Sequence, residues 1–394
     1  MLMDVGLIIL FGFLVYTAFE KLKLPGLLGL LLVGMVLGPH ALDLLSDDLM
    51  AISSDIRMMA LIIILLRAGF GLNRKALKAV GGVATRMSFI PVIFEGAVLL
   101  LLSWWLFELD VLSAGMLGFV LAAVSPAVIV PAMLSLIHRG YDKPHRIPSL
   151  VLLASSVDDV VAITIFSIFI NTALAQQSSF LGQLLRLPFS LFFGVLLGIL
   201  IGYILVKLFE RFHIRDSKKV LIILSAAIFL VLFEQVMNDI LPVAALIGVM
   251  MISIVIVDKR THVAERLAIK YEKIWLLAEV FLFVLVGATV NISLALSVGL
   301  MGILLILLGL TARAVGVFVA TMGTSYSVRQ KTFLTIAFMP KATVQAALGS
   351  LPLSLSLPHG ELILAISVIA ILITAPLGAI AIRYSYQPLL KTQA

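Results

Sequence analysis

Residues 155–165 of the chain read Ser155-Ser156-Val157-Asp158-Asp159-Val160-Val161-Ala162-Ile163-Thr164-Ile165. The two neighbouring aspartates lie in an apolar stretch, and no lysine, arginine or histidine falls within eight residues on either side of them. A carboxylate surrounded by hydrocarbon is costly unless a partner compensates its charge, so acids at membrane depth are typical of ion or proton sites. The sequence therefore predicts such a site at Asp158 and Asp159.

The composition indicates a membrane protein. Of 394 residues, 62% are hydrophobic and only 12% are charged, with a mean hydropathy of +1.20. The net charge of +7 comes from basic residues in short clusters between apolar runs, which does not resemble a nucleic-acid-binding surface. The chain has no cysteine, and its six histidines fall in predicted loops or helix ends. Metal enzymology is therefore not expected.

A membrane-spanning helix needs about 20 apolar residues. On that basis we expect an all-α polytopic membrane protein with about 13 transmembrane helices. Their predicted limits are 4–19, 25–38, 56–72, 87–107, 111–137, 148–171, 182–206, 219–236, 240–257, 274–290, 295–322, 332–355 and 361–382.

The basic residues predict how the chain crosses the membrane. When alternate loops are placed on opposite sides, most of the 28 lysines and arginines fall on one side, which is typical of the cytoplasmic face. This places the N-terminus outside and the C-terminus in the cytoplasm. The first twenty residues lack a basic n-region and a cleavage site, and so predict a first membrane helix. The absence of cysteine favours a bacterial plasma (inner) membrane.

An internal repeat relates the two halves of the chain. Leu24-Pro25 returns as Leu241-Pro242, and Gly69 with Asn73 returns as Gly287 with Asn291. The segment 125–134 aligns in the same way with 339–348. The paired spans are seven apart, so they enter the membrane from opposite sides. This predicts an inverted-topology repeat joined by the seventh span.

Prolines interrupt the fifth and twelfth predicted spans. Proline removes a backbone hydrogen bond and clashes with the preceding turn, so we expect helix breaks near Pro126 and Pro131 and near Pro340. Two crossed broken helices beside an acidic pair would form a cation site. Lys341 takes the place of Ala127 in the repeat, and its charge would offset the partial negative charge at the end of a broken helix.

Four motifs resemble the monovalent cation:proton antiporters, and within them the two-aspartate sodium/proton antiporters of the NHA type. They are Ser125–Pro131, Ser155–Ile163, Thr311–Arg313 and Phe338–Leu348. The resemblance implies a homodimer without cofactors, in which a mobile core domain carries the ion by an elevator-like movement. It places the dimerisation domain at 1–78 and 217–293, the core at 79–175 and 294–394, and a linker helix at 176–216.

The same resemblance makes Asp159 the ion-binding carboxylate and pairs Asp158 with Arg313. Helix geometry agrees with a division of roles, because neighbouring positions point about 100° apart. Ser155 lies four residues before Asp159 on a shared helix face and could supply a hydroxyl. Ser156 and Thr343 are weaker candidates for that role.

Other charges fall inside predicted spans. Glu95 needs a partner, which Arg313 or Lys341 could supply, unless it is a protonated core glutamate. Arginine does not release its proton, so a second transported proton would have to be carried by Asp158. Arg67 and Glu279 lie close to the ends of their spans, where a positioning role suffices.

These features predict a secondary transporter, in which Na⁺ or Li⁺ and H⁺ compete for Asp159, with Asp158 as a second ligand of the ion. K⁺/H⁺ exchange and a sodium-coupled symporter remain alternatives, although no organic substrate is expected because the facing positions are mostly Ala, Val and Leu. An intramembrane aspartyl protease needs two acids that face each other from separate helices. A channel needs a polar stripe along its pore, and the sequence has none.

Overall fold

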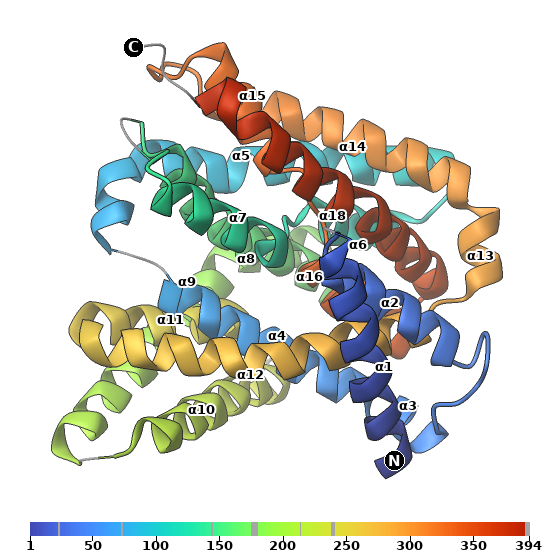
Figure 1. The fold of residues 1–394 in the computed structure, drawn as a ribbon, viewed down its shortest axis with the longest axis horizontal. Coiled ribbons are helices and arrows are strands. Elements are labelled where there is room, and N and C mark those ends of the chain that lie inside the picture. Colours follow the sequence, from blue (N-terminus) through green and yellow to red (C-terminus); the bar gives the residue numbers. More distant parts are fainter. Residues whose placement is uncertain are drawn as a thin grey trace. The chain divides into compact units, whose positions relative to one another are not determined.

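The computed structural model describes residues 1–22, 24–71, 74–142, 145–174, 180–212, 214–237 and 241–390, and the side chains within these ranges except at 74–80 and 180–188. The described residues form helices and no strands (Figure 1). Asn73, which the repeat pairs with Asn291, lies outside the described residues.

The chain divides into two compact units. The first, which we call unit 1, comprises Met1–Ser54, Ala76–Leu174 and Val280–Ala394. The second, unit 2, comprises Asp55–Lys75 and Ala175–Glu279. Both aspartates and all the predicted supporting residues belong to unit 1. The finer division into dimerisation, linker and core segments stays a prediction.

Unit 1 holds most of the helices. They are α1 (Leu2–Lys21), α2 (Gly26–Leu37), α3 (Asp47–Ala51), α5 (Arg74–Leu106), α6 (Val111–Ala122), α7 (Pro126–His138), α8 (Ile147–Leu174), α13 (Ile292–Ser297), α14 (Gly299–Ala320), α15 (Val328–Ala337), α16 (Thr343–Leu348), α17 (Leu351–Ser354) and α18 (Gly360–Leu390). Unit 2 contains α9 (Phe180–Arg211), α10 (Asp216–Met237) and α11 (Ala245–Lys259). Three helices contribute to both units. They are α4 (Ser53–Gly71), α12 (Thr261–Ala288) and α5, whose first two residues belong to unit 2.

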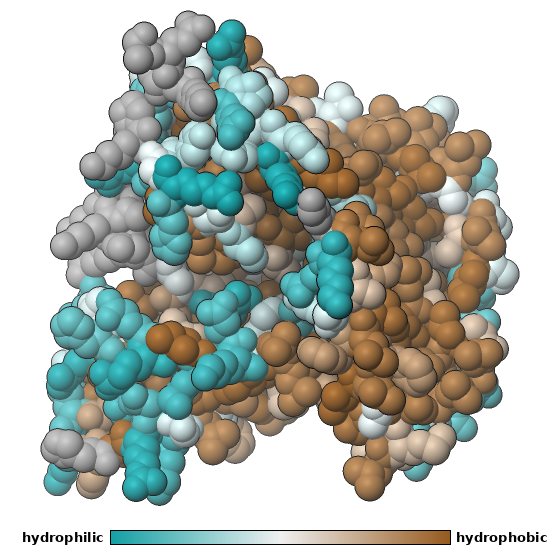
Figure 2. Space-filling model, viewed as in Figure 1, coloured by the Kyte–Doolittle hydropathy of each residue, from teal (hydrophilic) through white to brown (hydrophobic). Residues whose placement is uncertain are grey.

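The helices suit a lipid environment. Among the described residues, 8 helical segments are long and apolar enough to cross a membrane. Large apolar side chains such as Trp105 and Phe229, each 69% exposed, lie on the surface, and Figure 2 shows wide apolar areas on the face it displays. Every predicted span contains helix, although spans such as 111–137 and 332–355 also contain non-helical residues, and the number that crosses the bilayer stays a prediction. The basic segment 74–86, expected to form a loop, instead begins α5.

Two broken helices lie at the centre of unit 1. The first consists of α6 and α7, separated by extended residues 123–125, and the second of α15 and α16, separated by residues 338–342. The amide of Ser125 donates to the carbonyl of Pro340 at 2.8 Å, so the two breaks meet. The chain thus has the all-helical fold with crossed broken helices that the sequence predicts.

The position of the first break corrects one expectation. Pro126 occupies the first turn of α7, where a missing N–H costs nothing because no helical acceptor exists there. Pro131, expected to break the helix, lies inside α7. A helix tolerates such a proline when its neighbours accommodate the freed carbonyl. Only the residues before Pro126 are therefore non-helical in this span.

Close helix packing brings the charged residues together. A Cβ atom on Gly118 of α6 would lie 2.7 Å from the carbonyl oxygen of Gly96 in α5, so the two backbones touch. A Cβ atom on Gly316 of α14 would lie 2.7 Å from the Cα atom of Pro91, also in α5. Such contacts are possible only without a side chain, and they hold α6 and α14 against the part of α5 that carries Glu95.

Candidate ion site

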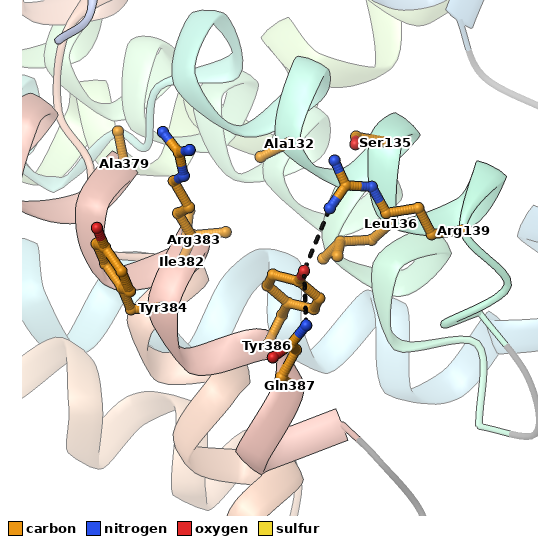
Figure 3. A pocket seen from close by; sticks show the side chains of 10 residues that line it. All are labelled: Ala132, Ser135, Leu136, Arg139, Ala379, Ile382, Arg383, Tyr384, Tyr386 and Gln387. Atoms are coloured by element: carbon orange, nitrogen blue, oxygen red, sulfur yellow. Dashed lines mark hydrogen bonds between the residues drawn. The ribbon is translucent and has the colours of Figure 1, made fainter. Parts of the chain in front are cut away.

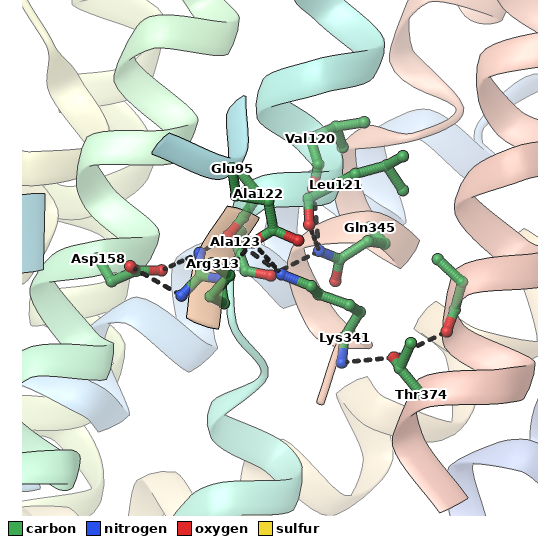
Figure 4. Close-up of polar contacts among 11 residues, drawn as sticks. Glu95, Val120, Leu121, Ala122, Ala123, Asp158, Arg313, Lys341, Gln345 and Thr374 are labelled. Atoms are coloured by element: carbon green, nitrogen blue, oxygen red, sulfur yellow. Dashed lines mark hydrogen bonds and ion pairs between the residues drawn. The ribbon is translucent and has the colours of Figure 1, made fainter. Parts of the chain in front are cut away.

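Arg313 of α14 lies at the centre of a buried charge network (Figure 4). Its Nη1 donates to Asp158 Oδ1 at 3.2 Å, and its Nη2 is 3.4 Å from Asp158 Oδ2. Its Nε donates to Glu95, and its Nη2 also donates to the carbonyl of Ala122. The forked guanidinium thus holds two carboxylates and the last residue of α6 at once, which a lysine could not do.

Lys341 completes the network from the second break. Its Nζ donates to Glu95 Oε2 at 2.7 Å and lies 3.3 Å from the Ala122 carbonyl oxygen. Its backbone amide donates to Thr374 Oγ1 of α18 at 2.9 Å. The lysine charge therefore lies at the C-terminal end of α6, where the helix dipole is partly negative. Glu95 has both of the partners that the sequence offered.

The network is balanced without Asp159. Two acids, Asp158 and Glu95, pair with two bases, Arg313 and Lys341. Asp159 is 4% exposed, and its Oδ1 atom has no hydrogen-bond partner among the described residues. The neighbouring aspartates thus differ completely in their surroundings, since one is clamped by arginine and the other keeps a buried oxygen unsatisfied.

Asp159 lies beside the first helix break. The backbone amide of Val124, between α6 and α7, faces its carboxylate. Ser155, one turn earlier on α8, is fully buried, and its hydroxyl donates only to its own helix, to Leu152 O at 3.3 Å. Thr343 at the start of α16 is 2% exposed, and its Oγ1 has no partner among the described residues. Among those residues, no cluster of three or more acidic, histidine or cysteine side chains could hold a metal ion.

Gln345 belongs to the structure of the site but was not singled out in the sequence. Its side-chain Nε2 lies 2.9 Å from Val120 O, 3.4 Å from Leu121 O and 2.8 Å from Ala123 O. These carbonyls belong to the end of α6, where helical partners are missing. The sequence signal that could have identified Gln345 is its side-chain amide within an otherwise mostly apolar segment. Gln345 therefore fixes the C-terminal end of the first broken helix from α16.

Replacing Gln345 by methionine should destabilise the protein. The variant keeps the side-chain volume but leaves buried carbonyls without a donor, which costs about 1–3 kcal/mol. We expect a lower midpoint in thermal unfolding of the purified protein, whereas Gln235→Met, on the exposed face of α10, should leave it unchanged. Equal midpoints for both variants would show that the three contacts do not stabilise the break.

The remaining intramembrane charges lie elsewhere. In unit 2, the Nη2 atom of Arg67 lies 3.4 Å from Glu272 Oε1, and the Glu272 side chain is 68% exposed. Such an exposed pair contributes little stability. Glu279 is 8% exposed and lies within α12.

Comparison with known proteins identifies the family. Residues 6–384 match the family model described as sodium/hydrogen exchanger, transmembrane. The chain is 33% identical over 397 residues to Sodium/hydrogen exchanger 9B2 of Mus musculus, covering 95% of this chain and 69% of the relative. It is 33% identical over 374 residues to Sodium/hydrogen exchanger 9B1 of Homo sapiens, covering 91% of this chain and 71% of the relative.

A solved structure shares the fold. The sodium proton antiporter MjNhaP1 from Methanocaldococcus jannaschii superimposes with a TM-score of 0.86 at 22% sequence identity, covering 98% of each chain. At this identity the likeness concerns the fold. This fold match and the family match over nearly the whole chain agree with the helical architecture described above. The chain belongs to the sodium/hydrogen exchanger family, whose members are multi-pass membrane transporters of cations and protons and neither enzymes nor cofactor-dependent proteins.

Proposed function

We propose that this protein exchanges Na⁺ or Li⁺ for H⁺ across a membrane, with cation and proton competing for Asp159. One observation carries the proposal: Asp159 retains a buried, unsatisfied carboxylate oxygen beside a network whose charges already balance. A buried anion of this kind needs a cation or a proton. Either a cation or a proton neutralises the Asp159 carboxylate, so the two need not bind at the same time.

The charge arithmetic explains why exchange is obligatory. With the network neutral, an empty site carries one negative charge on Asp159 and an occupied site carries none. Moving an uncompensated charge through a low-dielectric barrier is costly, so the empty site crosses slowly. Na⁺ carried in one direction must therefore be followed by H⁺ in the other. Asp158 does not take part directly because Arg313 holds both of its oxygens.

Neighbouring polar groups supply further oxygen ligands. Na⁺, a hard cation, prefers oxygen, and the Ser155 hydroxyl and the free Oγ1 of Thr343 are the candidates that the sequence predicted. The backbone of Val124, at the first helix break, also lies beside Asp159. Arg313, Lys341 and Glu95 keep this arrangement in place, and Pro126 and Pro340 hold the breaks open.

Ser155→Ala should weaken sodium binding without abolishing transport. Loss of one hydroxyl ligand to a charged group is worth about 1.4 kcal/mol, or about a tenfold rise in KM for Na⁺ with little change in maximal rate. Ser167→Ala, which removes a hydroxyl that donates to Ile163 O about three turns further along α8, is the matched control and should leave KM within about twofold. Sodium-dependent rates in proteoliposomes measure both. Equal KM values for the two variants would remove Ser155 from the site.

The assembly and orientation complete the proposal. The protein acts as a homodimer in a plasma membrane, with its N-terminus outside and its C-terminus in the cytoplasm, where it contributes to pH homeostasis. The core that contains Asp159 moves across the membrane as an elevator. Support comes from the clustering of basic residues on one side of the predicted spans and from the family. Cross-linking between protomers and labelling of engineered cysteines test these statements.

The decisive test of the function uses purified protein in sealed liposomes. A pH gradient, acid inside, is imposed and followed with an entrapped dye while NaCl, LiCl, KCl or choline chloride is added outside. We expect Na⁺ and Li⁺ to collapse the gradient, and K⁺ and choline to leave it. A response to K⁺ alone would replace the proposal by K⁺/H⁺ exchange, and no response to any cation would refute antiport.

A further inference from the structure

A partly polar cavity lies in unit 1, and neither aspartate lines it. It measures about 540 Å³ and is formed by α7 and α18 together with Arg139, which follows α7 (Figure 3). The residues that line it are Ala132, Ser135, Leu136, Arg139, Ala379, Ile382, Arg383, Tyr384, Tyr386 and Gln387. Neither the cation network nor the transport scheme uses any of them.

The lining offers positive charge and hydrogen-bond donors. Arg139 and Arg383 contribute two guanidinium groups, and Tyr384, Tyr386 and Gln387 add hydroxyl and amide donors. No acidic side chain is among the described residues that line the cavity. Apart from Ser135, the remaining wall is apolar, and Leu136 and Ile382 are buried. A cavity of this composition is complementary to an anion.

Some of the hydrogen-bond donors that line the cavity are held in place by neighbours, and others remain unused. The Tyr386 hydroxyl oxygen accepts from Arg139 Nη1 at 3.2 Å and from Gln387 Nε2 at 3.3 Å, so its own hydrogen is free to donate. Arg139 also lies over the Tyr386 ring, with its Cζ 6.0 Å from the centroid. Arg383 has no ion pair or hydrogen bond among the described residues. The structure thus fixes one arginine and leaves the other available.

We propose that this cavity binds a phosphate-bearing anion. Two guanidinium groups match the charge and geometry of phosphate oxygens, which accept paired hydrogen bonds from arginine. Arg139 follows the predicted span 111–137 and Arg383 follows the predicted span 361–382, and the alternation of loops expected from the charge distribution places both ends on the cytoplasmic side. Basic pockets between transmembrane helices on that side accommodate lipid headgroups. A lipid headgroup and a free phosphate share this chemistry.

The two helices that form the cavity also contact the cation site. The first turn of α7 contains Pro126, directly after the break that faces Asp159. On α18, the hydroxyl of Thr374 accepts a hydrogen bond from the backbone amide of Lys341. An anion held by Arg139 and Arg383 therefore ties together two elements that position the transport site. Binding should stabilise unit 1, and this consequence can be measured without transport.

The test compares wild-type protein with Arg139→Gln/Arg383→Gln in detergent. One arm measures thermal unfolding with inorganic phosphate, and the other measures it with short-chain phosphatidic acid or with phosphatidylcholine of the same chain length. We expect a higher midpoint with a phosphate ligand in the wild type, and at least about tenfold weaker binding in the double variant. Arg329→Gln/Lys331→Gln, which removes two basic residues outside the cavity, should bind as the wild type does.

The arms identify the source of the ligand. Stabilisation by inorganic phosphate indicates a soluble anion, and stabilisation by phosphatidic acid alone indicates a lipid headgroup. Arg383→Gln by itself breaks no interaction among the described residues, so it keeps the test valid if the double variant does not fold. Equal binding by wild type and Arg383→Gln in both arms, or no stabilisation by either phosphate compound, would overturn the proposal.

Discussion

Asp159→Asn should abolish sodium-driven proton movement in proteoliposomes. The amide keeps the size of the side chain and can still form hydrogen bonds, but it offers no negative charge to a cation and takes up no proton. Since Asp158, Glu95, Arg313 and Lys341 already balance one another, no other carboxylate in the network is left to replace it. The rate should fall to that of liposomes without protein.

Removing this charge should not damage the fold. Asp159 is buried and has no ionic partner in the part of the chain that the structure describes, so its neutralisation removes a cost of burial, and thermal stability should be unchanged or higher. Asp48→Asn, on the exposed surface of α3, makes the same chemical change away from the site and should transport normally. Undiminished exchange by Asp159→Asn would show that the ion binds elsewhere.

Arg313→Gln has the largest expected effect on stability. The side chain is fully buried and contacts Asp158, Glu95 and the Ala122 carbonyl. Without it, two buried carboxylates share the single charge of Lys341. Breaking a buried ion pair by removing one partner costs about 3–5 kcal/mol. The variant should therefore unfold at a markedly lower temperature or fail to accumulate in the membrane.

A double-mutant cycle separates charge imbalance from lost packing. Glu95→Gln in the Arg313→Gln background restores the balance between acids and bases, so the double variant should be more stable than the sum of the two single changes predicts. Arg313→Lys keeps the charge but loses the fork, and should fall between the wild type and Arg313→Gln. Strict additivity in the cycle would contradict a coupled network.

The sequence predicted the membrane class well, and it pointed to the charged residues that lie together in unit 1. Charged residues in apolar segments are conspicuous, so Asp158, Asp159, Arg313 and Lys341 could be found without a structure. The two breaks could be anticipated because proline disfavours helix continuation. Composition and hydropathy reveal these residues directly, because a charged side chain or a helix break within the bilayer costs free energy and is therefore rare in a membrane-spanning segment.

The sequence could not supply the pairing between helices. Helix geometry separates Asp158 and Asp159 by about 100°, but it does not say which of them faces α14. That depends on the rotation of α8, which is set by packing. The same limit applies to Gln345, whose contacts cross to α6. Pro131 is a case in which the sequence predicted too much. The sequence alone predicts a helix break there, but α7 continues through this proline.

The central claim is that Na⁺ and H⁺ occupy one carboxylate in turn, and the pH dependence of sodium transport tests it most directly. Initial rates of sodium uptake are measured over a matrix of Na⁺ concentration and pH with the wild-type protein. Competition predicts that KM for Na⁺ rises by about tenfold for each unit of acidification once the proton dominates the site, while the maximal rate at saturating Na⁺ stays constant. A constant KM with a maximal rate that falls on acidification would contradict the account.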